Sequence, residues 1–586
     1  MDIKLQAGNI MFTKSKRLID RISRILGPIS DFVKSRDYLQ ILLVFSFFII
    51  VFTYVYFSVD TLSSSDDHFF HFRFAEIMRE NGILQSFFDF KSIYFSKMAQ
   101  GNEYFVYYNF LFYLFVIPFT FIKPLFLGIK LYGVIAASLG FTGLYWCLKK
   151  LSVAMPFFWT AIIFSITGPV LLIRFFISRP FTLAPVLLLL LLYFLHKKSY
   201  FWVFFISFIY LFWHSSTFFF PLIVIFTYFI FEKFYREKGN LSNVLAGIGG
   251  VAISLGCLFL FAPGFFSYMT DIIFGVYTET ILGHRVSIPE GNELYPANFF
   301  NFIKSSSLLV CALIITVSVF LFRYFYSKIK NSSDNDFESS DMIKSRQSIL
   351  GASFFLSISF FLGTVALSRR FEDFFVFFSA LFIVLSFDEI LVFFRIESKV
   401  ISKAFVGGLV VSFFYLFASN MLSLQEIISR GASVENFRQA GEWLDKNVPS
   451  GKIVFNTSWN WFPQLYYHSP RHNYVIGLEP RFLYVHDANL YWKWFHIGKD
   501  GYVCEKEDCP RVEAMNRLAN RKESSKNIWY EKEGEAIANV IINDFHSSHV
   551  VTNNSYATFN TILDNSARFE KAFSGNNGIY IYKVKS

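Results

Sequence analysis

Long apolar runs separated by short polar segments make up most of the chain before residue 423. A helix needs about 20 mostly apolar residues to cross the roughly 30 Å of hydrocarbon in a bilayer. Measured against this length, the pattern predicts about eleven transmembrane helices. The predicted helices are 39–58, 127–147, 153–172, 181–196, 199–213, 215–232, 241–263, 304–326, 348–367, 372–394 and 404–422.

One more apolar run, 104–122, is long enough for a twelfth crossing. It is rich in aromatic residues and contains Asn109 and Pro118, which suits a helix lying in the membrane interface. We therefore expect this run not to cross, and the distribution of basic residues favours the same choice.

Basic residues are distributed unevenly between the segments that join the predicted helices. With eleven crossings, the segments on the N-terminal side hold 22 Lys and Arg in 83 residues, and those on the other side hold 10 in 120. Because basic residues accumulate on the cytoplasmic side, we expect 1–38 to be a basic cytoplasmic N-terminus and 39–423 to be a membrane domain. Its large external loops are then 59–126 and 264–303.

The apolar pattern ends near Gln425, where the composition becomes that of a soluble domain. Since an odd number of crossings separates it from the N-terminus, 424–586 is predicted to be an extracytoplasmic α/β domain. Its predicted elements are helices at 433–447 and 556–566 and strands at 452–456, 549–552 and 578–583. Cys504 and Cys509 lie in this domain and could form a disulfide in an oxidising compartment.

The composition agrees with a polytopic α-helical membrane protein. Hydrophobic residues make up 54% of the chain and charged residues 17%, with 80 Phe among 586 residues and a mean hydropathy of +0.42. These values exclude a soluble, a disordered or a disulfide-stabilised chain. The net charge of +10 is explained by Lys and Arg that flank membrane spans, so we expect membrane lipids and no nucleic acid as partners. In a bacterium this would be a multi-pass protein of the inner membrane.

Charged groups are costly inside a bilayer, so functional residues are expected at the ends of the spans. Two adjacent carboxylates, Asp66 and Asp67, follow the first predicted helix, with His68 and His71 close behind. Such a group could bind a divalent cation or accept a proton. Alternatively, Ser65 or Asp66 simply caps an amphipathic helix with Asp67 in its first turn, which spacing alone favours.

The external loop 264–303 is long for a loop with little regular structure, which is typical of a lid or binding loop. Its acidic residues are Glu279, Glu290 and Glu293. Each of them could also be an ordinary solvated carboxylate.

Arg369 and Arg370 lie in a four-residue external turn, against the usual charge distribution, so they are expected to meet an anion. That anion is either a neighbouring carboxylate, Glu372 or Asp373, or a phosphate at the membrane surface. Arg179, together with Arg174 of the turn 173–180, would add positive charge to the same region.

Three of these segments resemble motifs of one family. Asp-His-Phe-Phe-His-Phe-Arg at 67–73 resembles the Asp-Pro-Tyr-Phe-His-Tyr-Arg segment that follows the first span in the catalytic subunit of oligosaccharyltransferases, which are membrane glycosyltransferases of the GT-C class. Ser-Ile-Pro-Glu at 287–290 is similar to that family's external-loop motif, and Arg-Arg-Phe at 369–371 resembles its later Arg-Phe pair. The order of the motifs and the predicted side of the membrane also agree.

The resemblance implies a GT-C-like fold and a donor sugar carried on a polyprenyl phosphate or pyrophosphate. Asp67, with Asp66 beside it, would be the catalytic acidic residue, and Glu290 the loop carboxylate at the same centre. The donor phosphate would bind to Arg370 or Arg369, with Arg179 adding to the site. The acceptor would be a protein, a lipid or a glycan.

The same resemblance makes a divalent cation, Mg or Mn, a candidate cofactor at Asp67 and Glu290. However, the turn 173–180 contains no acid where the family has its second acidic motif. At the start of the external domain, Ser-Trp-Asn-Trp at 458–461 takes the place of the family's Trp-Trp-Asp-Tyr-Gly acceptor motif. Its candidate acceptor-binding residues are Trp459, Asn460 and Trp461, although the tryptophans could equally be core anchors.

The sequence therefore favours a membrane glycosyltransferase that transfers a sugar or oligosaccharide on the extracytoplasmic side. The alternative is a non-enzymatic transporter or flippase of lipid-linked glycans, which would explain the hydrophobicity equally well. A transporter predicts polar residues within the spans and two related halves. The acidic residues instead gather at one end of the spans, and no internal repeat is found.

Overall fold

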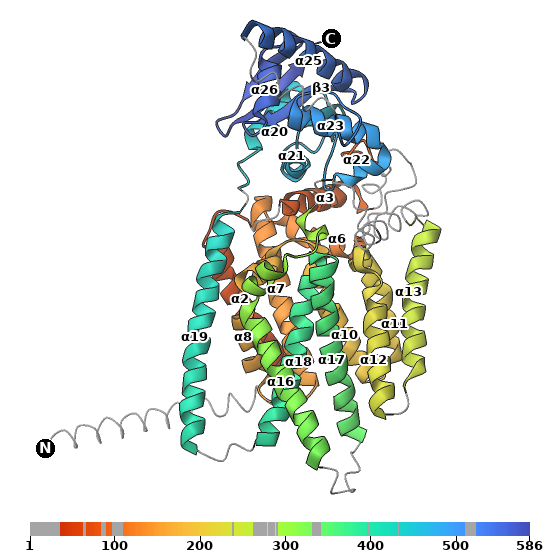
Figure 1. The fold of residues 1–586 in the computed structure, drawn as a ribbon, viewed down its shortest axis with the longest axis vertical. Helices are drawn as coiled ribbons and strands as arrows, with labels where there is room; N and C mark the ends of the chain where they lie inside the picture. The colour runs from red at the N-terminus through yellow and green to blue at the C-terminus, as the bar shows by residue number, and fades with distance from the viewer. Residues whose placement is uncertain are drawn as a thin grey trace, which may run out of the picture.

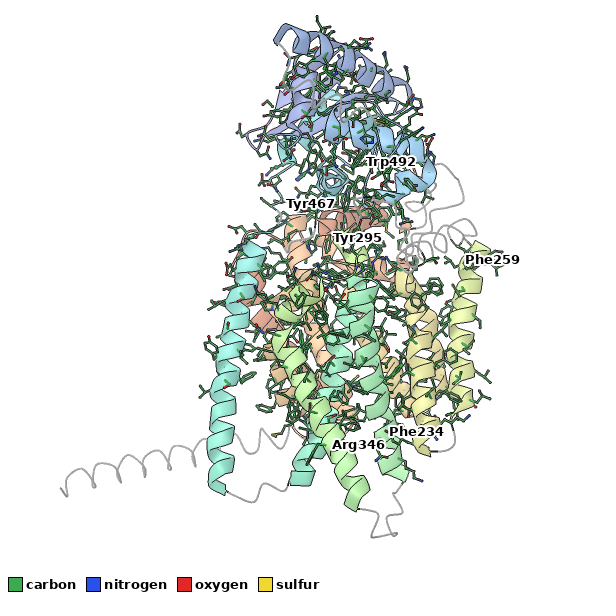
Figure 2. All side chains as sticks on the ribbon, in the orientation of Figure 1. Phe234, Phe259, Tyr295, Arg346, Tyr467 and Trp492 are labelled. Carbon is green, nitrogen blue, oxygen red and sulfur yellow. A yellow bond between two sulfur atoms is a disulfide. The ribbon has the colours of Figure 1, made fainter. Side chains whose placement is uncertain are left out.

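The computed structural model describes residues 36–62, 66–83, 90–96, 109–236, 239–261, 266, 278, 288, 291–330, 341–394, 399–431, 433–509 and 523–585. A bundle of long helices forms one part, and a small α/β domain lies on one end of it (Figure 1). Tyr295 and Tyr467 lie in the layer between the two parts, whereas Phe234 and Arg346 mark the opposite end of the bundle (Figure 2).

Each of the predicted transmembrane runs coincides with a helix of the bundle. These helices are α2 (Asp37–Phe57), α7 (Leu125–Lys150), α8 (Pro156–Ile166), α10 (Ala184–His196), α11 (Tyr200–Trp213), α12 (Phe220–Arg236), α13 (Leu241–Phe261), α16 (Ser307–Lys330), α17 (Asp341–Ala366), α18 (Glu372–Phe394) and α19 (Lys399–Ser429).

The predicted count of eleven crossings is not confirmed. Among the described residues, six helices are long and apolar enough to cross a membrane, or up to eight if each of two bent pairs is one span. The bent pairs are Pro156–Ile166 with Pro169–Phe176, at 106°, and Phe299–Ser305 with Ser307–Phe322, at 91°. The helices α10 and α11 have only 13 and 14 residues. The protein is thus a multi-pass membrane protein, while its exact number of crossings and its orientation stay predictions.

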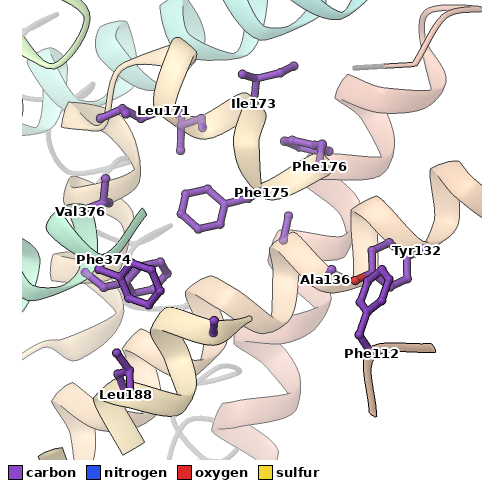
Figure 3. Packing of buried hydrophobic residues seen from close by; sticks show 14 of the residues in the cluster. Phe112, Tyr132, Ala136, Leu171, Ile173, Phe175, Phe176, Leu188, Phe374 and Val376 are labelled. Carbon is purple, nitrogen blue, oxygen red and sulfur yellow. The ribbon is translucent and has the colours of Figure 1, made fainter. Parts of the chain in front are cut away.

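Phenylalanine rings pack the interior of the bundle. After the break at Gly168, the chain forms α9 (Pro169–Leu172) and the short helix η2 (Ile173–Phe176), of which Leu171, Phe175 and Phe176 are buried in the core (Figure 3). The ring centroid of Phe175 lies 5.4 Å from that of Phe377, and the centroid of Phe176 lies 5.1 Å from that of Phe52. This packing fixes the turn that follows, which carries Arg179.

Three helical elements lie at the end of the bundle beneath the α/β domain. The helix α3 (Asp67–Asn81) lies across this end (Figure 1) and buries Phe69, Phe70, Phe72 and Phe74. The described part of the run 104–122 forms α6 (Phe110–Val116) and the 3-10 helix η1 (Ile117–Phe121), which together are too short to span a bilayer.

The C-terminal domain, which is called the external domain below after its predicted location, contains a five-stranded sheet in the order β2-β1-β3-β5-β4. The strands are β1 (Ile453–Asn456), β2 (Asn473–Tyr474), β3 (Ser547–Asn553), β4 (Phe569–Ser574) and β5 (Ile579–Val584). The strand β1 pairs in parallel with β2 and β3, and β5 pairs antiparallel with β3 and β4. The helices around it are α20 (Arg438–Asn447), α21 (Phe462–His468), α22 (Arg481–His486), α23 (Ala488–Asp500), α25 (Glu523–Asn543) and α26 (Ala557–Asp564).

The predicted α/β composition of this domain is confirmed, with local differences. The helix expected over 433–447 begins at Arg438, because the chain forms turns over 434–437. Cys504 and Cys509 form a disulfide. A segment of the first external loop also joins the sheet edge, where Tyr474 N donates to Ser92 O at 2.8 Å and Tyr94 N donates to Tyr474 O at 3.0 Å. The external domain is therefore tied to the loop as well as to α19.

Candidate active site

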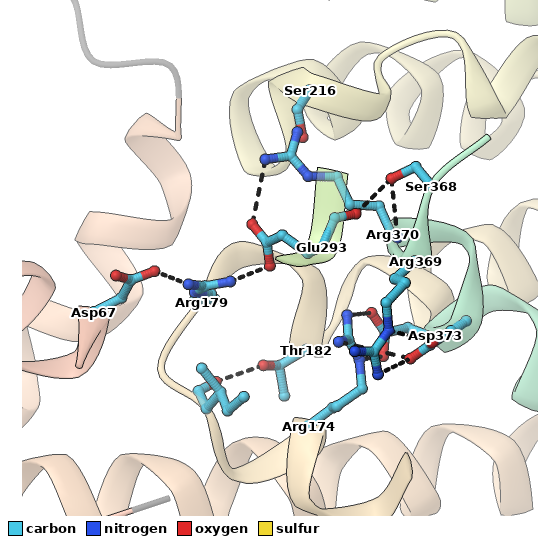
Figure 4. Close-up of polar contacts among 12 residues, drawn as sticks. Asp67, Arg174, Arg179, Thr182, Ser216, Glu293, Ser368, Arg369, Arg370 and Asp373 are labelled. Atoms are coloured by element: carbon cyan, nitrogen blue, oxygen red, sulfur yellow. Dashed lines mark hydrogen bonds and ion pairs between the residues drawn. The ribbon is translucent and has the colours of Figure 1, made fainter. Parts of the chain in front are cut away.

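Four elements bring charged side chains together at the end of the bundle that faces the external domain. The first turn of α3 carries Asp67, and the turn between η2 and η3 (Pro180–Thr182) carries Arg179. The short helix η5 (Asn292–Leu294) carries Glu293, and η6 (Arg369–Phe371) carries Arg370. Residues far apart in the sequence thus form one cluster (Figure 4).

A continuous chain of ion pairs connects these side chains. The Arg179 guanidinium contacts Asp67 through Nη2 and Glu293 through Nη1, so it bridges the two carboxylates. The other oxygen of Glu293, Oε1, lies 3.3 Å from Nη2 of Arg370. The four side chains are between 19% and 25% exposed, so the cluster is shielded but still accessible to a ligand.

Hydrogen bonds to the backbone hold the turns that carry these residues. Trp213 Nε1 donates to the carbonyl of Pro180 at 2.7 Å, which ties the Arg179 turn to the end of α11. The Ser368 hydroxyl donates to the Glu293 carbonyl at 2.6 Å and accepts from the Arg370 N–H at 3.2 Å. The external loop and the Arg370 turn are therefore fixed to each other.

A second group of ion pairs lies below the first. Arg174 donates to both carboxylate oxygens of Asp373, from Nε at 2.7 Å and from Nη2 at 2.8 Å. Arg369 Nε donates to Glu372 at 2.8 Å. Of the two adjacent arginines, Arg369 is thus paired with a neighbouring carboxylate of its own helix turn, whereas Arg370 joins the cluster of Asp67 and Arg179.

The charges in the cluster shift the pKa values of its carboxyl groups in opposite directions. Burial would raise the pKa of Glu293, but Arg179 and Arg370 outweigh it and hold that pKa at about 2. For Asp67 burial is the larger effect, and its pKa is raised although Arg179 opposes the shift. Asp67 is therefore the better proton acceptor of the two, because a raised pKa means a stronger base.

The buried histidines of α3 support the cluster without carrying charge. The pKa of His71 lies well below its usual value because of burial and the nearby Arg179. Its Nδ1 lies 2.7 Å from the Tyr113 hydroxyl, and His68 Nδ1 accepts the Ser178 N–H at 2.9 Å. Sequence reasoning did not single out Tyr113, whose partner lies 42 positions away.

Asp66 lies at the start of α3, but its side chain does not cap the helix. Instead, Asp66 Oδ1 accepts from Gln464 Nε2 of the external domain at 2.9 Å. The adjacent carboxylates therefore have different roles in the structure. Asp67 faces the arginine cluster, and Asp66 joins α3 to α21 of the external domain.

The Asp66 contact predicts a pH dependence of stability. Burial raises the pKa of Asp66 to about 6, although the hydrogen bond from Gln464 opposes the shift. Because the folded protein then binds more protons than the unfolded chain, stability should fall as the pH rises from about 4 to about 6. The Asp66→Asn variant should lose this part of the pH dependence, measured as the apparent melting temperature of the purified protein. Identical pH profiles for the variant and the wild type would contradict the assignment.

The structure leaves one predicted residue untested and places three others away from the ion pairs. Glu290 lies outside the described residues; within the described part of the loop, Glu293 is the carboxylate that contacts the arginines. In the external domain, Trp459 and Trp461 belong to the 3-10 helix η7 (Trp459–Trp461) and are partly buried, whereas Asn460 is exposed.

The environment of the tryptophans suits core anchors. The ring centroid of Trp461 lies 5.6 Å from that of Phe437 and 5.5 Å from that of Tyr556, and Trp459 packs against the core of the domain. The segment continues directly into α21, which bears Gln464. An acceptor-binding role for this segment stays a prediction.

The described residues do not fit a divalent cation. Within the described ranges, no group of three or more His, Cys, Asp or Glu could hold a metal ion. The two carboxylates that approach each other, Asp67 and Glu293, are bridged by the guanidinium of Arg179, which occupies the position that a cation would need. The chemistry of the site is therefore derived from the protein's own residues.

Comparisons with known proteins add information about the fold. No profile of a known protein family matches the sequence, and no curated protein matches it. Among solved structures, the arabinofuranosyltransferase AftD from Mycobacteria is similar, with a TM-score of 0.52 and 10% sequence identity over 94% of this chain. A variant of the same enzyme gives 0.53 and 11% over 94% of this chain. The chain therefore shares its fold with part of the solved AftD chains.

The similarity to a solved glycosyltransferase agrees with the fold class predicted from the short motifs, whereas the closer resemblance to oligosaccharyltransferases is not shown. The chain spans 40% to 42% of the length of the solved AftD chains. The shared fold says nothing by itself about the substrates. These have to be inferred from the site.

Proposed function

We propose that this protein is a glycosyltransferase that transfers a sugar from a polyprenyl-phosphate or polyprenyl-pyrophosphate donor to an acceptor on the extracytoplasmic side. The observation that supports this most directly is the chain Asp67–Arg179–Glu293–Arg370. It combines one basic carboxylate with two guanidinium groups at the end of a membrane bundle, which are the groups that sugar transfer from a lipid phosphate requires.

In the proposed reaction, the Asp67 carboxylate accepts the proton of an acceptor hydroxyl or amide group as that group attacks the anomeric carbon. A bond forms between the acceptor and the anomeric carbon, and the bond from that carbon to the phosphate oxygen breaks. The electron pair stays on the phosphate, whose growing charge Arg370 and Arg179 stabilise. The lipid phosphate then leaves into the membrane.

The acceptor is proposed to approach from the external domain, which lies over α3. Asp66, the residue before Asp67, accepts a hydrogen bond from Gln464 of this domain, so the domain is held next to Asp67. The exposed Asn460 lies just before α21, the helix that carries Gln464. A protein, lipid or glycan acceptor is compatible with this placement. Because a solved arabinofuranosyltransferase has a similar fold, donors that carry a single pentofuranose should be tested as well as donors that carry an oligosaccharide.

The test is a transfer assay with the full-length protein in proteoliposomes. Donors would carry a labelled pentofuranose, hexose or oligosaccharide on a polyprenyl phosphate or pyrophosphate, and membranes of the source organism would supply the acceptors. Label that leaves the lipid fraction and becomes covalently bound to an acceptor is expected. Movement of intact donor across the bilayer, without any transfer, would instead indicate a flippase.

Metal removal provides a separate prediction. Since Arg179 already lies between the carboxylates of Asp67 and Glu293, transfer is expected to continue at an unchanged rate in EDTA. The measurement compares initial rates after chelation, and after Mg²⁺ or Mn²⁺ is added back. Loss of transfer in EDTA and recovery with metal would show that Asp67 binds a cation together with residues outside the described part of the chain.

A further inference from the structure

The ion-pair cluster has as many negative as positive charges before any substrate binds. Asp67 and Glu293 carry one negative charge each, and Arg179 and Arg370 carry one positive charge each. A donor phosphate that entered beside them would leave excess negative charge in a partly dehydrated site, which is unfavourable. Departure of one carboxylate would therefore favour the binding of a phosphate.

The Glu293 carboxylate lies between Arg179 and Arg370, where a bound anion would be expected. Its two oxygens accept from two guanidinium groups that come from different turns, Oε2 from Arg179 and Oε1 from Arg370. Convergence of two arginines from separate elements on one oxyanion is the arrangement by which proteins bind phosphate. Asp67, in contrast, is paired with Nη2 of Arg179, on the other side of that guanidinium from Glu293.

Buried donors near the cluster have no acceptor among the described residues. These are Arg179 Nε and the hydroxyls of Ser178 and Ser215, of which Ser178 and Ser215 are at least 98% buried. Ser215 lies two residues after Trp213, whose indole holds the Arg179 turn, and Ser216 lies beside Arg370 (Figure 4). Both oxygens of the Glu293 carboxylate are already in use. A ligand with more acceptor oxygens than a carboxylate, such as a phosphate, offers a further acceptor to Arg179 Nε, which belongs to the cluster itself.

We propose that the Glu293 carboxylate occupies the donor-phosphate site in the resting protein and is exchanged for the phosphate when the lipid-linked donor binds. The inference rests on the proposed function and adds a role for the external loop. In the exchange, Arg179 and Arg370 pass from Glu293 to the phosphate, so the charge balance is kept for a singly charged phosphodiester. Glu293 and its segment move toward solvent, while Asp67 keeps its contact with Arg179.

The test measures binding of farnesyl phosphate to the purified full-length protein at about pH 5, where this phosphomonoester carries roughly one negative charge, with inorganic phosphate as the headgroup-only probe. Glu293→Gln removes the competing charge but keeps the shape, so farnesyl phosphate should bind about tenfold more tightly, as expected when a charge-assisted contact no longer competes. Glu372→Gln is the matched control, because Glu372 is also paired with arginines but lies outside the bridge between Arg179 and Arg370. Its affinity should equal that of the wild type.

Weaker or unchanged binding by Glu293→Gln would overturn the exchange, since a residue that only positions the arginines would weaken binding when neutralised. A second measurement needs no variant: in the wild type, farnesyl phosphate should increase amide hydrogen exchange over 291–297 if Glu293 is released, and decreased exchange would contradict it. Stronger binding of inorganic phosphate than of farnesyl phosphate would place a free phosphate, not a lipid headgroup, in the site.

Failure of the exchange and failure of the proposed function give different results. If the wild type binds farnesyl phosphate and transfers sugar, but Glu293→Gln does not bind more tightly, only the exchange is wrong. If neither the wild type nor Glu293→Gln binds farnesyl phosphate, both proposals are wrong. Binding that is detected only after the substitution would support the exchange.

Discussion

Asp67→Asn is expected to lower the rate of sugar transfer by a factor of about 10² to 10⁴, the usual contribution of a general base. Asparagine has the same shape and can still accept a hydrogen bond from Arg179, but it cannot take the proton of the acceptor. Loss of the base should therefore appear mainly in kcat, with little change in the KM for the donor. The measurement is the initial rate of transfer from a polyprenyl-linked donor, at matched amounts of folded protein.

Two other variants of α3 make this prediction specific. Asp66→Asn changes the neighbouring carboxylate, which contacts Gln464, and should reduce transfer by much less than Asp67→Asn. Glu80→Gln changes an exposed carboxylate on the same helix, paired with Arg79, and should leave transfer unchanged. Normal transfer by Asp67→Asn, or an equal loss in Asp66→Asn, would show that Asp67 is not the base.

The contrast between Asp66 and Asp67 also shows how far local sequence patterns reach. The pattern placed both residues at the start of an amphipathic helix, and α3 does begin at Asp67. It also indicated Asp66 as a helix cap, but the Asp66 side chain has a partner 398 positions later in the chain instead. Local periodicity predicts a helix, whereas such a contact depends on how distant segments pack.

The same limit applies to Glu293. A short motif pointed to Glu290, which lies outside the described residues and stays a prediction, whereas Glu293 had been recognised only as an acidic residue of the same loop. The partners of Glu293, Arg179 and Arg370, are 114 and 77 positions away, so no local pattern indicates this pairing. The arginines themselves were predictable, because basic residues at an external turn run against the charge distribution of the chain.

Transmembrane helices were located by their hydrophobicity, but their bends were not predicted. The predicted helix 153–172 is interrupted at Gly168 and Pro169, and the chain turns by 106° there. Proline lacks the N–H that continues a helix, so this pair is a recognisable signal of a break. A hydropathy profile averages over a window of residues, so a single Gly-Pro pair within an apolar run does not appear in it. The run 153–172 is therefore predicted as one long span. The segment after the bend carries Arg174 and Arg179 at the end of the bundle.

Arg370→Met is expected to lower kcat/KM for the donor by a factor of about 10² to 10³, as is usual when one donor to a developing oxyanion is removed. Methionine keeps much of the length and the apolar contacts of the side chain but cannot pair with a phosphate. The loss should be largest for the natural donor and accompanied by weaker binding of farnesyl phosphate. The measurement therefore combines transfer kinetics with direct binding of the lipid phosphate.

Arg369→Met is the matched control for this variant, because Arg369 is the adjacent residue in the same short helix η6 and is also an arginine. Arg369 donates to Glu372 at 2.8 Å and is not part of the bridge to Asp67, so its replacement should reduce donor affinity far less. An equal loss in both variants would indicate a general effect of positive charge at the membrane surface. A larger loss in Arg369→Met would place the phosphate at the second group of ion pairs, near Glu372. Only the predicted order, with Arg370 more sensitive than Arg369, agrees with phosphate binding between Arg179 and Arg370.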